Sequence, residues 1–498
     1  MPVLPSAGTH EADVAVVGAG AAGLYAALCA ARERASVVLV SATPLAQTAS
    51  YWAQGGLAAA LAADDSFELH LRDTELAGRA LVRRTAAETL VREAPERVRD
   101  LQALGVRFDA DRFGHLALGL EGGHSVRRVV HAGGSATGRR VVRQLSALAV
   151  EEPRIQVFEG ARAQALWTDA DGTRHRCRGV VCDDGRVIAA RAVVIATGGA
   201  AALWARTTNP PGSQGIGLLL AHAAGATLAD LELLQFHPTA VIGIPGREGF
   251  LVTEAIRGEG ATLHDASGER FVDELAPRDE VSRAIQALLE RSGQRSVGLD
   301  MRAIDPAHFP NVVASLREAG VDPTRELIPV APAAHYMMGG IVTDLDARST
   351  LPGLYAVGES SCTGLHGANR LASNSLSECF VFARRAVADA LSRPAQALPA
   401  ASERELARLR EIPAPAIAER ATREALWRDA GVVRNPEGLS GLLTDPHPLA
   451  RMIARCALAR TESRGAHLRA DHPERDPAFD FRHVLVIGED AISWETWH

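Results

Sequence analysis

The feature that most constrains this chain is a glycine-rich turn between an apolar run and an alanine-rich run. Residues 13–17 read DVAVV, the turn at 18–23 reads GAGAAG, and a helix is predicted from there to about Arg32. A second valine-rich run covers residues 37–40. This order of strand, glycine turn, helix and strand predicts the opening of a doubly wound, dinucleotide-binding sheet.

The glycines of this turn have separate physical roles. Gly18 allows the tight turn, Gly20 lets the backbone approach a pyrophosphate, and Gly23 lets the helix pack closely on the sheet. The free N–H groups at the start of the helix then face the phosphates. An NAD site usually has an acidic residue at the end of the second strand, where this chain has Ser41 and Ala42. The absence of an acidic residue at this place counts against NAD as the ligand, and it neither favours nor disfavours FAD.

The composition excludes several classes of function. The 498 residues carry a net charge of −7, so the chain offers no basic stripe for nucleic acid. All 53 residues counted as lysine or arginine are arginine. A pyridoxal-phosphate enzyme needs a Schiff-base lysine and a P-loop needs a lysine of its own, so the sequence excludes both.

Six cysteines are scattered along the chain without a CxxC pair. We therefore predict no metal site and no iron–sulfur cluster, and we expect reduced thiols in a cytoplasmic protein. The uncharged stretch 14–31 has the length of a membrane helix, but it is mostly Ala and Gly, and acidic residues precede it. We interpret it as a buried strand, turn and helix, and we expect no membrane segment.

Two later apolar runs, 191–199 and 353–359, are bounded by glycines, which suggests one sheet interrupted by insertions. Past residue 400 the sequence is rich in Ala, Arg, Glu and Leu at helical spacing. The predicted fold class is α/β, with a Rossmann-like FAD-binding domain, an inserted α+β capping domain and a C-terminal helical domain. The expected boundaries are 1–230 and 337–400 for the FAD-binding domain, 231–336 for the capping domain and 401–498 for the helical domain.

A long series of motifs follows in a fixed order along the chain. They are GAGAAG at 18–23, ASYWAQGG at 49–56, EGGHS at 121–125, ATGG at 196–199, QFHPTA at 235–240, LVTEAIRGEGA at 251–261, APRDEVSRAI at 276–285, AAHYMMGG at 333–340 and GLHGANRLASNSL at 364–376. From about Asp13 to Ala386 the chain thereby resembles the L-aspartate oxidases, within the fumarate reductase and succinate dehydrogenase flavoprotein superfamily. The resemblance implies FAD-dependent oxidation of L-aspartate to iminoaspartate, with oxygen or fumarate as electron acceptor. That reaction is the first step of de novo NAD biosynthesis through quinolinate.

Two arginines and two histidines stand in polar, glycine-flanked segments, a set that suits a dicarboxylate substrate. Arginine binds carboxylate through a bidentate fork, and histidine adds a hydrogen bond. Taken singly, each of these residues is more often a core or surface residue than a site residue. By resemblance, the residues that hold the two substrate carboxylates are His237, Thr253, His335 and Arg370.

Arg278 matches the arginine that the family uses as proton donor or acceptor. An arginine is a poor base in water because its pKa exceeds about 12. Our hypothesis is that a buried site relays the proton between Arg278 and Glu254 or Arg257.

Glu121 begins the EGGHS segment, which resembles aspartate oxidases rather than succinate dehydrogenases. A buried carboxylate there would pair with the α-ammonium of L-aspartate, a group that succinate lacks. The alternative is an ordinary solvated glutamate in a surface loop.

Succinate dehydrogenases and membrane-bound fumarate reductases carry a histidine that binds FAD covalently, and the matching position here is Ala49. We therefore expect FAD to be bound non-covalently. Ala42 and Ile216 stand where the family often has polar residues that contact FAD. The expected FAD-binding residues are Gly18, Ala19, Gly20, Ala21, Ala22, Gly23, Ser41, Ala49, Ser50, Gln54, Gly55, Gly56, Glu359, Ser375 and Leu376.

Two other functions compete with amino-acid oxidation. One is a soluble fumarate reductase, against which Glu121 argues, and the other is a flavin-binding scaffold that has lost catalysis. The partners we expect are L-aspartate, fumarate or succinate, and O2, with functional coupling to quinolinate synthase and without nucleic acid or membrane. The sequence leaves open the physiological electron acceptor, the oligomeric state, feedback by NAD and the direct transfer of iminoaspartate.

Overall fold

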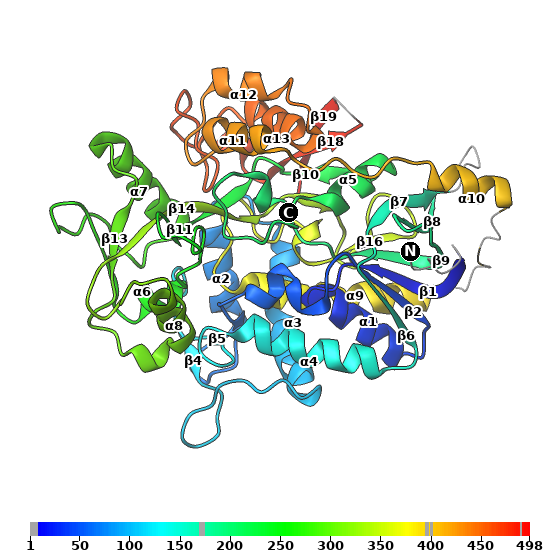
Figure 1. The fold of residues 1–498 in the computed structure, drawn as a ribbon, viewed down its shortest axis with the longest axis horizontal. Helices are drawn as coiled ribbons and strands as arrows, with labels where there is room; N and C mark the ends of the chain where they lie inside the picture. The colour runs from blue at the N-terminus through cyan, green and yellow to red at the C-terminus, as the bar shows by residue number, and fades with distance from the viewer. Residues whose placement is uncertain (1–7, 169–174, 394–397, 399–401, 489–490) are drawn as a thin grey trace.

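A computed structural model describes residues 8–168, 175–393, 398, 402–488 and 491–498. Its centre is the predicted opening unit, in which β1 (Thr9–Val17), α1 (Ala21–Arg32) and β2 (Val37–Ser41) follow one another. β1 pairs in parallel with β2 on one side and with β9 (Val187–Ile195) on the other (Figure 1). The expected α/β class is confirmed.

The central sheet has the order β6-β2-β1-β9-β8-β7, with β16 also paired to β9. The additional strands are β6 (Ile155–Glu159), β7 (Ala163–Thr168), β8 (Cys177–Cys182) and β16 (Leu354–Ala356). β9 and β16 come from the two later apolar runs, so segments more than 150 residues apart in sequence lie side by side in one sheet.

Both faces of the central sheet are buried, as continuous Val-rich strands predict. Val14 and Val16 pack with helices on one face, whereas Ala15 and Val17 pack into a second core on the other face. The helices below the sheet in Figure 1 are α1, α3 (Arg84–Ala103), α4 (Thr137–Glu151) and α9 (Asn374–Ser392). α2 (Phe67–Ala77) precedes α3, and α5 (Ile216–Ala223) packs against the second core.

The turn after β1 requires glycine at two positions. Gly18 has φ +109°, and a Cβ there would lie 2.3 Å from the carbonyl oxygen of Ala196. A Cβ on Gly23 would lie 1.8 Å from the carbonyl oxygen of Gly18. The close approach of helix to sheet that the sequence predicted therefore depends on these two missing side chains.

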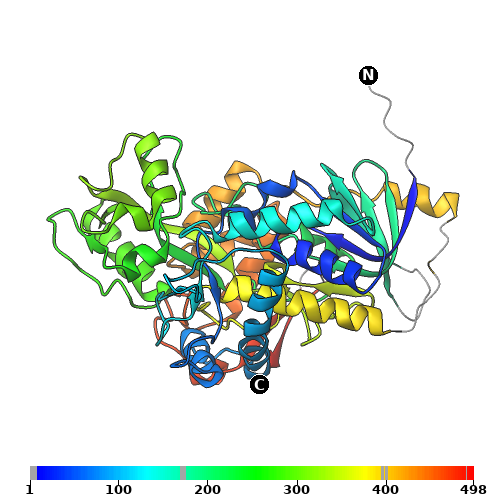
Figure 2. The same ribbon diagram turned by 90° about the horizontal axis from the view of Figure 1, so that it is seen from below.

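Between the two late strands of the central sheet, the chain forms a second, antiparallel sheet of order β11-β14-β13-β12. Its core lies between the sheet and three helices and includes Val241, Ile285, Leu299 and Val330. In Figures 1 and 2 this segment projects from the end of the molecule opposite the edge of the central sheet. Its elements are β11 (Leu234–Val241), α6 (Glu254–Gly258), β12 (Thr262–His264), α7 (Arg278–Ser292), β13 (Val297–Asp300), α8 (Pro310–Glu318) and β14 (Ile328–Met337).

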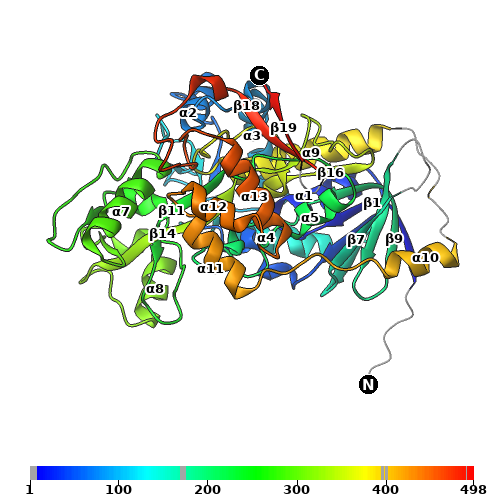
Figure 3. The same cartoon turned by 90° about the horizontal axis from the view of Figure 1, so that it is seen from above.

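The C-terminal part contains the expected helices, and three of them lie over the middle of the molecule in Figure 3. The four helices are α10 (Glu403–Arg410), α11 (Arg420–Asp429), α12 (Pro436–Leu442) and α13 (Pro448–Ala459). α10 stands apart from the others and packs through Leu406 and Leu409 on Trp167. The predicted boundary between residues 400 and 401 lies outside the described residues.

A hairpin of β18 (Arg482–Ile487) and β19 (Ala491–Thr496) follows these helices, and the sequence reasoning did not predict it. β18 also pairs with β10 (Leu228–Ala229), which completes a sheet of order β17-β15-β10-β18-β19. The other two strands are β15 (Gly340–Val342) and β17 (Ser361–Cys362). β10, β15 and β17 have only two or three residues each, so local pattern gave little signal for the sheet that the hairpin joins.

Three short strands, β3 (Leu57–Ala58), β5 (Val129–Val130) and β4 (Leu118–Gly119), form a small sheet near α4. Within the described residues, no helix combines the length and the apolar character needed to cross a lipid bilayer.

Candidate functional site

The predicted substrate residues gather where the antiparallel sheet meets the loop before α9. His237 lies on β11 and His335 on the adjacent β14, and their ring centroids are 5.0 Å apart. Arg278 is the first residue of α7, and Arg370 lies in the loop that precedes α9. All four lie close together although they span 134 residues of sequence.

Two of these arginines meet at one amide group. The Oε1 atom of Gln235 accepts hydrogen bonds from Arg278 Nη1 at 3.1 Å and from Arg370 Nη2 at 3.2 Å. The amide nitrogen of Gln235 is itself fixed by the carbonyl of Arg370 and the side chain of Asn369. The Nε of Arg370 is buried without a hydrogen-bond partner. Donors left over on two guanidinium groups form a site that suits carboxylates.

The charge of Arg370 persists despite its burial. Burial lowers the pKa of Arg370 to about 10, and the nearby Arg278 charge contributes to the shift. The guanidinium also lies over the Tyr336 ring, 4.8 Å from its centroid, where a cation is favoured. At neutral pH this side chain is therefore a cation that attracts an anionic ligand.

Arg278 continues into a chain of buried ionic contacts. Its Nε donates to Glu254 Oε2 at 2.5 Å, and Arg257 Nη2 lies 3.3 Å from the other carboxylate oxygen. Arg257 is buried, and one of its Nη atoms donates to the carbonyl of Glu274. Burial lowers the pKa of Arg257. Both residues that the sequence reasoning named for a relay thus contact one another directly.

The two histidines are neutral at physiological pH. Burial, together with the neighbouring Arg278 charge, holds the pKa of His237 and of His335 well below the ordinary value. The Nδ1 of His237 accepts the backbone N–H of Thr239 at 3.3 Å, so its proton lies on Nε2. The Nδ1 of His335 is 2.8 Å from the hydroxyl of Thr208. In each ring, a hydrogen bond at Nδ1 fixes the orientation, and Nε2 remains available to a ligand.

Glu121 is only 2% exposed, so the surface-loop alternative does not hold. His131 Nε2 lies 3.1 Å from one carboxylate oxygen, and the Ser373 hydroxyl donates to the other at 2.6 Å. Burial opposes ionisation, but hydrogen bonds from His131 and Ser373 and the charge of Arg278 lower the pKa of Glu121 to about 2. The site therefore contains a buried carboxylate at neutral pH.

The loop after Glu121 and the predicted substrate residue Thr253 both lie next to Glu254. A Cβ on the next residue, Gly122, would lie 2.2 Å from Glu254 Oε1, so the EGGHS loop packs against the Glu254 carboxylate. Thr253, the other predicted substrate residue, is buried at the N-cap of α6 immediately before Glu254, and its side chain does not cap the helix.

The residues expected at FAD lie along the glycine turn and the segment beside it. The Ser50 hydroxyl accepts the N–H of Ala21 at 3.1 Å, and it lies 3.1 Å from where a Cβ on Gly20 would stand. Ala49 and Ser50 belong to a short 3-10 helix at Ala49–Trp52. Ala19, Ala21 and Ala22 are buried around the start of α1, where the N-cap residue Gly20 has no side chain to cap the helix. This cradle fits a pyrophosphate that approaches the backbone.

Gln54 has an amide oxygen without a partner, and Glu359 has a carboxyl group with a raised pKa. Gln54 donates to the carbonyl of Leu251 at 2.7 Å, whereas its Oε1 is buried without a partner. Glu359 accepts the N–H of Met337 at 2.9 Å, and burial raises its pKa to about 7. An unpartnered amide oxygen and a carboxyl group of this kind fit the hydroxyl and ring edges of FAD.

The remaining expected FAD residues have mixed surroundings. Ser375 and Leu376 lie in the first turn of α9, where backbone N–H groups are free, and the Ser375 hydroxyl also accepts from Arg370 at 3.2 Å. The N–H of Gly56, next to Gly55, donates to Ser373 at 3.1 Å. Ser41 instead turns its hydroxyl to the carbonyl of Thr43 at 2.6 Å.

The sequence reasoning missed three residues that organise the site: Gln235, Ser373 and His131. Gln235 stands in QFHPTA and Ser373 in GLHGANRLASNSL, so both lie in motifs that the sequence singled out. Their importance comes from long-range contacts, such as Ser373 to Glu121 across 252 residues, which spacing alone does not reveal.

Known proteins are similar to this chain over nearly its whole length. Residues 13–376 match the FAD binding domain family, and residues 442–496 match the fumarate reductase flavoprotein C-terminal family. An L-aspartate oxidase of Caulobacter vibrioides is 47% identical, with 97% of each chain covered. An L-aspartate oxidase of Agrobacterium fabrum is 42% identical, covering 93% of this chain and 91% of the relative.

The chain belongs to the L-aspartate oxidase family.

Solved structures place this family in its superfamily. A mutant of E. coli quinol fumarate reductase FrdA superposes with a TM-score of 0.88 at 30% identity, covering 98% of this chain and 97% of that one. The Mycobacterium smegmatis Sdh1 complex superposes with a TM-score of 0.82 at 31% identity, covering 98% and 94%. The expected fold, the FAD cofactor and the superfamily are therefore confirmed.

The raised pKa of Glu359 predicts a pH dependence that a substitution removes. Because the folded state holds this proton more tightly than the unfolded state, stability falls as pH rises from about 4.5 to about 7. Relative to Glu359→Gln, wild-type apoprotein should lose about 1 to 2 kcal/mol of stability between pH 5 and pH 7. Urea unfolding of both apoproteins at the two pH values measures the difference. If the difference in stability between the two proteins is the same at both pH values, the raised pKa of Glu359 is contradicted.

Proposed function

We propose that this chain catalyses the FAD-dependent oxidation of L-aspartate to iminoaspartate. The observation that carries the proposal is the meeting of two arginine side chains on Gln235 beside the buried carboxylate of Glu121. The arginines supply donors for a dicarboxylate, and the carboxylate supplies a partner for an ammonium group. The L-aspartate oxidases of the family support the same reaction.

Substrate binding rests on five side chains with separate roles. Arg370 binds one substrate carboxylate through its free donors. Arg278 binds the substrate from the side on which both arginines contact Gln235. His237 and His335, both neutral, donate to carboxylate oxygens without adding charge. Thr253 lies beside them, at the start of α6, where its hydroxyl completes the set.

Glu121 distinguishes an amino acid from its deaminated analogue. Its carboxylate remains ionised at neutral pH, since its pKa lies near 2. An ammonium group finds a charged partner there, whereas succinate presents only C–H groups at the same place. A buried charge paired in this way contributes selectivity because its loss leaves the partner unsatisfied.

Proton movement follows the chain from Arg278 to Glu254 to Arg257. The 2.5 Å contact from Arg278 Nε to Glu254 lets the carboxylate take or return a proton while the guanidinium stays fixed over the substrate. Arg257, buried behind Glu254, stabilises the charge that remains.

Bound FAD supplies the hydride acceptor for the oxidation of the Cα–N bond. The residues we propose to hold it are the glycine turn at 18–23, the segment 49–56, Glu359 and the first turn of α9. Ala49 carries no group that forms a covalent link, so binding is non-covalent. The capping domain, residues 231–336, closes over the substrate and excludes water.

We propose that the product, iminoaspartate, passes to quinolinate synthase. We also propose that O2 or fumarate takes the electrons, and that the protein works in the cytoplasm. All six cysteines are free thiols, which suits a reducing compartment. A fumarate reductase is the second candidate, because the dicarboxylate clamp fits fumarate and a fumarate reductase shares the fold.

An anaerobic titration separates these candidates. We expect L-aspartate to bleach the oxidised flavin band of the purified holoprotein, and succinate in a parallel cuvette to leave it unchanged. Bleaching by neither, with rapid reoxidation of reduced enzyme by fumarate, would establish a fumarate reductase instead. Bound flavin that responds to none of the three would indicate a scaffold.

Substitution of Glu121 tests the ammonium partner. Glu121→Gln should lower kcat/KM for L-aspartate about tenfold to a hundredfold, the size expected for a lost charge-assisted hydrogen bond. Fumarate reduction should change little. Glu259→Gln removes an exposed carboxylate and serves as the control. Equal loss of both activities would exclude the assigned role.

Substitution of Arg278 tests the proton path. Arg278→Lys keeps a positive charge but loses the guanidinium geometry, so succinate binding should persist while fumarate reduction falls about a hundredfold or more. The same change at Arg283, which lies further along α7, should have no such effect. Full fumarate reduction by Arg278→Lys would show that the proton takes another route.

A further inference from the structure

A junction between three parts of the chain lies at residues 78–81, immediately after α2. Arg79 and Ala80 both adopt left-handed backbone, with φ of +57° and +56°. Residues with side chains rarely adopt this conformation, and two in succession persist only where surrounding contacts hold them. The contacts that hold them come from the loop before α9 and from the C-terminal part of the chain.

Distant segments bind the carbonyls of Gly78, Arg79 and Ala80 in this turn. The Gly78 carbonyl accepts the N–H of Ala368, in the loop that carries Arg370, at 3.0 Å. The Ala80 carbonyl accepts the N–H of Phe481 at 3.0 Å, and the Arg79 carbonyl accepts from Arg464 Nη1 at 2.6 Å. The turn is therefore fixed to the substrate loop on one side and to the C-terminal part on the other.

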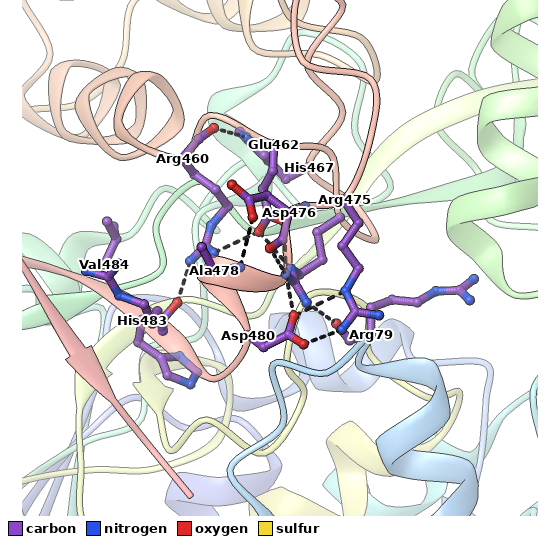
Figure 4. Close-up of polar contacts among 12 residues, drawn as sticks. Arg79, Arg460, Glu462, His467, Arg475, Asp476, Ala478, Asp480, His483 and Val484 are labelled. Atoms are coloured by element: carbon purple, nitrogen blue, oxygen red, sulfur yellow. Dashed lines mark hydrogen bonds and ion pairs between the residues drawn. The ribbon is translucent and has the colours of Figure 1, made fainter.

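The C-terminal anchor is an ionic cluster around the buried side chains of Arg464 and Glu462. Arg464 has a fully buried side chain that pairs with Glu462 at 2.7 Å and with Asp480 at 2.8 Å. Glu462 also contacts Arg460 at 3.3 Å, and Arg475 binds Asp480 at 2.5 Å. Figure 4 shows Arg79 beside this cluster. These ion pairs fix the Arg464 guanidinium, and its hydrogen bond in turn fixes the Arg79 carbonyl.

The side chain of Arg79 points to the third part, the first turn of α7. Its Nη2 lies 3.1 Å from Asp279 and 2.5 Å from Glu280. Asp279 has a side chain only 1% exposed, so this pair is screened far less than a surface pair. Arg278, whose guanidinium binds Gln235 and Glu254, is the residue immediately before Asp279.

We infer that Arg79 is a positioning residue, which holds the first turn of α7, and with it Arg278, in place over the dicarboxylate site. The inference rests on the proposed function. A fixed turn reduces the entropy cost of the ion pair, since the Arg79 backbone is already ordered before the pair forms. Displacement of a reacting group by about 1 Å costs up to about a hundredfold in rate, so a contact at this position affects catalysis without contacting substrate.

The test compares Arg79→Ala with Arg79→Lys and with Arg283→Ala. Arg283 lies on α7 itself and contacts the same Asp279 at 3.5 Å, so its removal takes away a guanidinium without breaking a link between parts of the chain. For each holoprotein we would measure flavin content, melting temperature, the rise in melting temperature caused by succinate, and kcat and KM for L-aspartate.

Arg79→Ala should retain FAD, show a smaller rise in melting temperature with succinate, and lose about tenfold in kcat/KM, as expected when the competent position of α7 is only partly populated. Arg79→Lys should recover part of the loss, because lysine pairs with one carboxylate at a time. Arg283→Ala should match wild type both in the rise in melting temperature with succinate and in kcat/KM. A purely structural role would lower the melting temperature without changing the response to succinate.

Equal behaviour of Arg79→Ala, Arg283→Ala and wild type would overturn the inference. If Arg79→Ala fails to fold, Glu280→Ala decides, because it removes the half-exposed partner and should weaken succinate binding by a smaller factor. No effect of Glu280→Ala or Arg79→Lys on succinate binding or on kcat/KM would also refute it. If wild type reduces fumarate but does not oxidise L-aspartate, the proposed function fails, and the same comparison made with fumarate tests Arg79 independently.

Discussion

The burial of several like charges in one place is the constraint on which the rest of this site depends. Arg257, Arg278 and Arg370 lie close together and are removed from water, a costly arrangement unless opposite charge is supplied nearby. Glu254 pairs with Arg257 and with Arg278. The charges of Glu254 and Glu121 also favour the cationic form of Arg370. Arg278 and Arg370 keep donors for a dicarboxylate ligand, so an anionic substrate relieves the remaining repulsion between the three cations.

This charge arrangement explains why the site lies between parts of the chain rather than within one. The antiparallel sheet supplies the two histidines and Gln235, α6 and α7 supply the Glu254–Arg278 pair, and the loop before α9 supplies Arg370. The doubly wound sheet fixes the glycine turn, which carries the expected cofactor residues, on the other side of the site. Substrate and cofactor residues thus belong to separately packed cores, and only their joint position makes a site.

Much of this could be predicted from the sequence, and the reasons are local. The DVAVV-GAGAAG unit has a strand, a turn that tolerates only glycine at Gly18 and Gly23, and a helix, all within 20 residues, so pattern and sterics agree. His237, Arg278, His335 and Arg370 were named because motif resemblance located them, and the structure brings them together. Local pattern failed where contacts join distant residues. Ser373 reaches Glu121 across 252 residues, and the β18–β19 hairpin pairs with a two-residue strand at Leu228–Ala229.

The pairing of β18 with β10 has a consequence for how the chain reaches its native state. A separation of 254 residues lies between Val484 and Asp230, and the backbone N–H of Val484 donates to the Asp230 carboxylate at 3.1 Å. During synthesis the chain emerges from the N-terminal side, so β10 waits with an open edge while the whole segment up to the hairpin is made. The glycine turn and α1 are able to form early, because their contacts are local. β18 and β19 are made after every other strand of this sheet, so the sheet closes only once they have been synthesised.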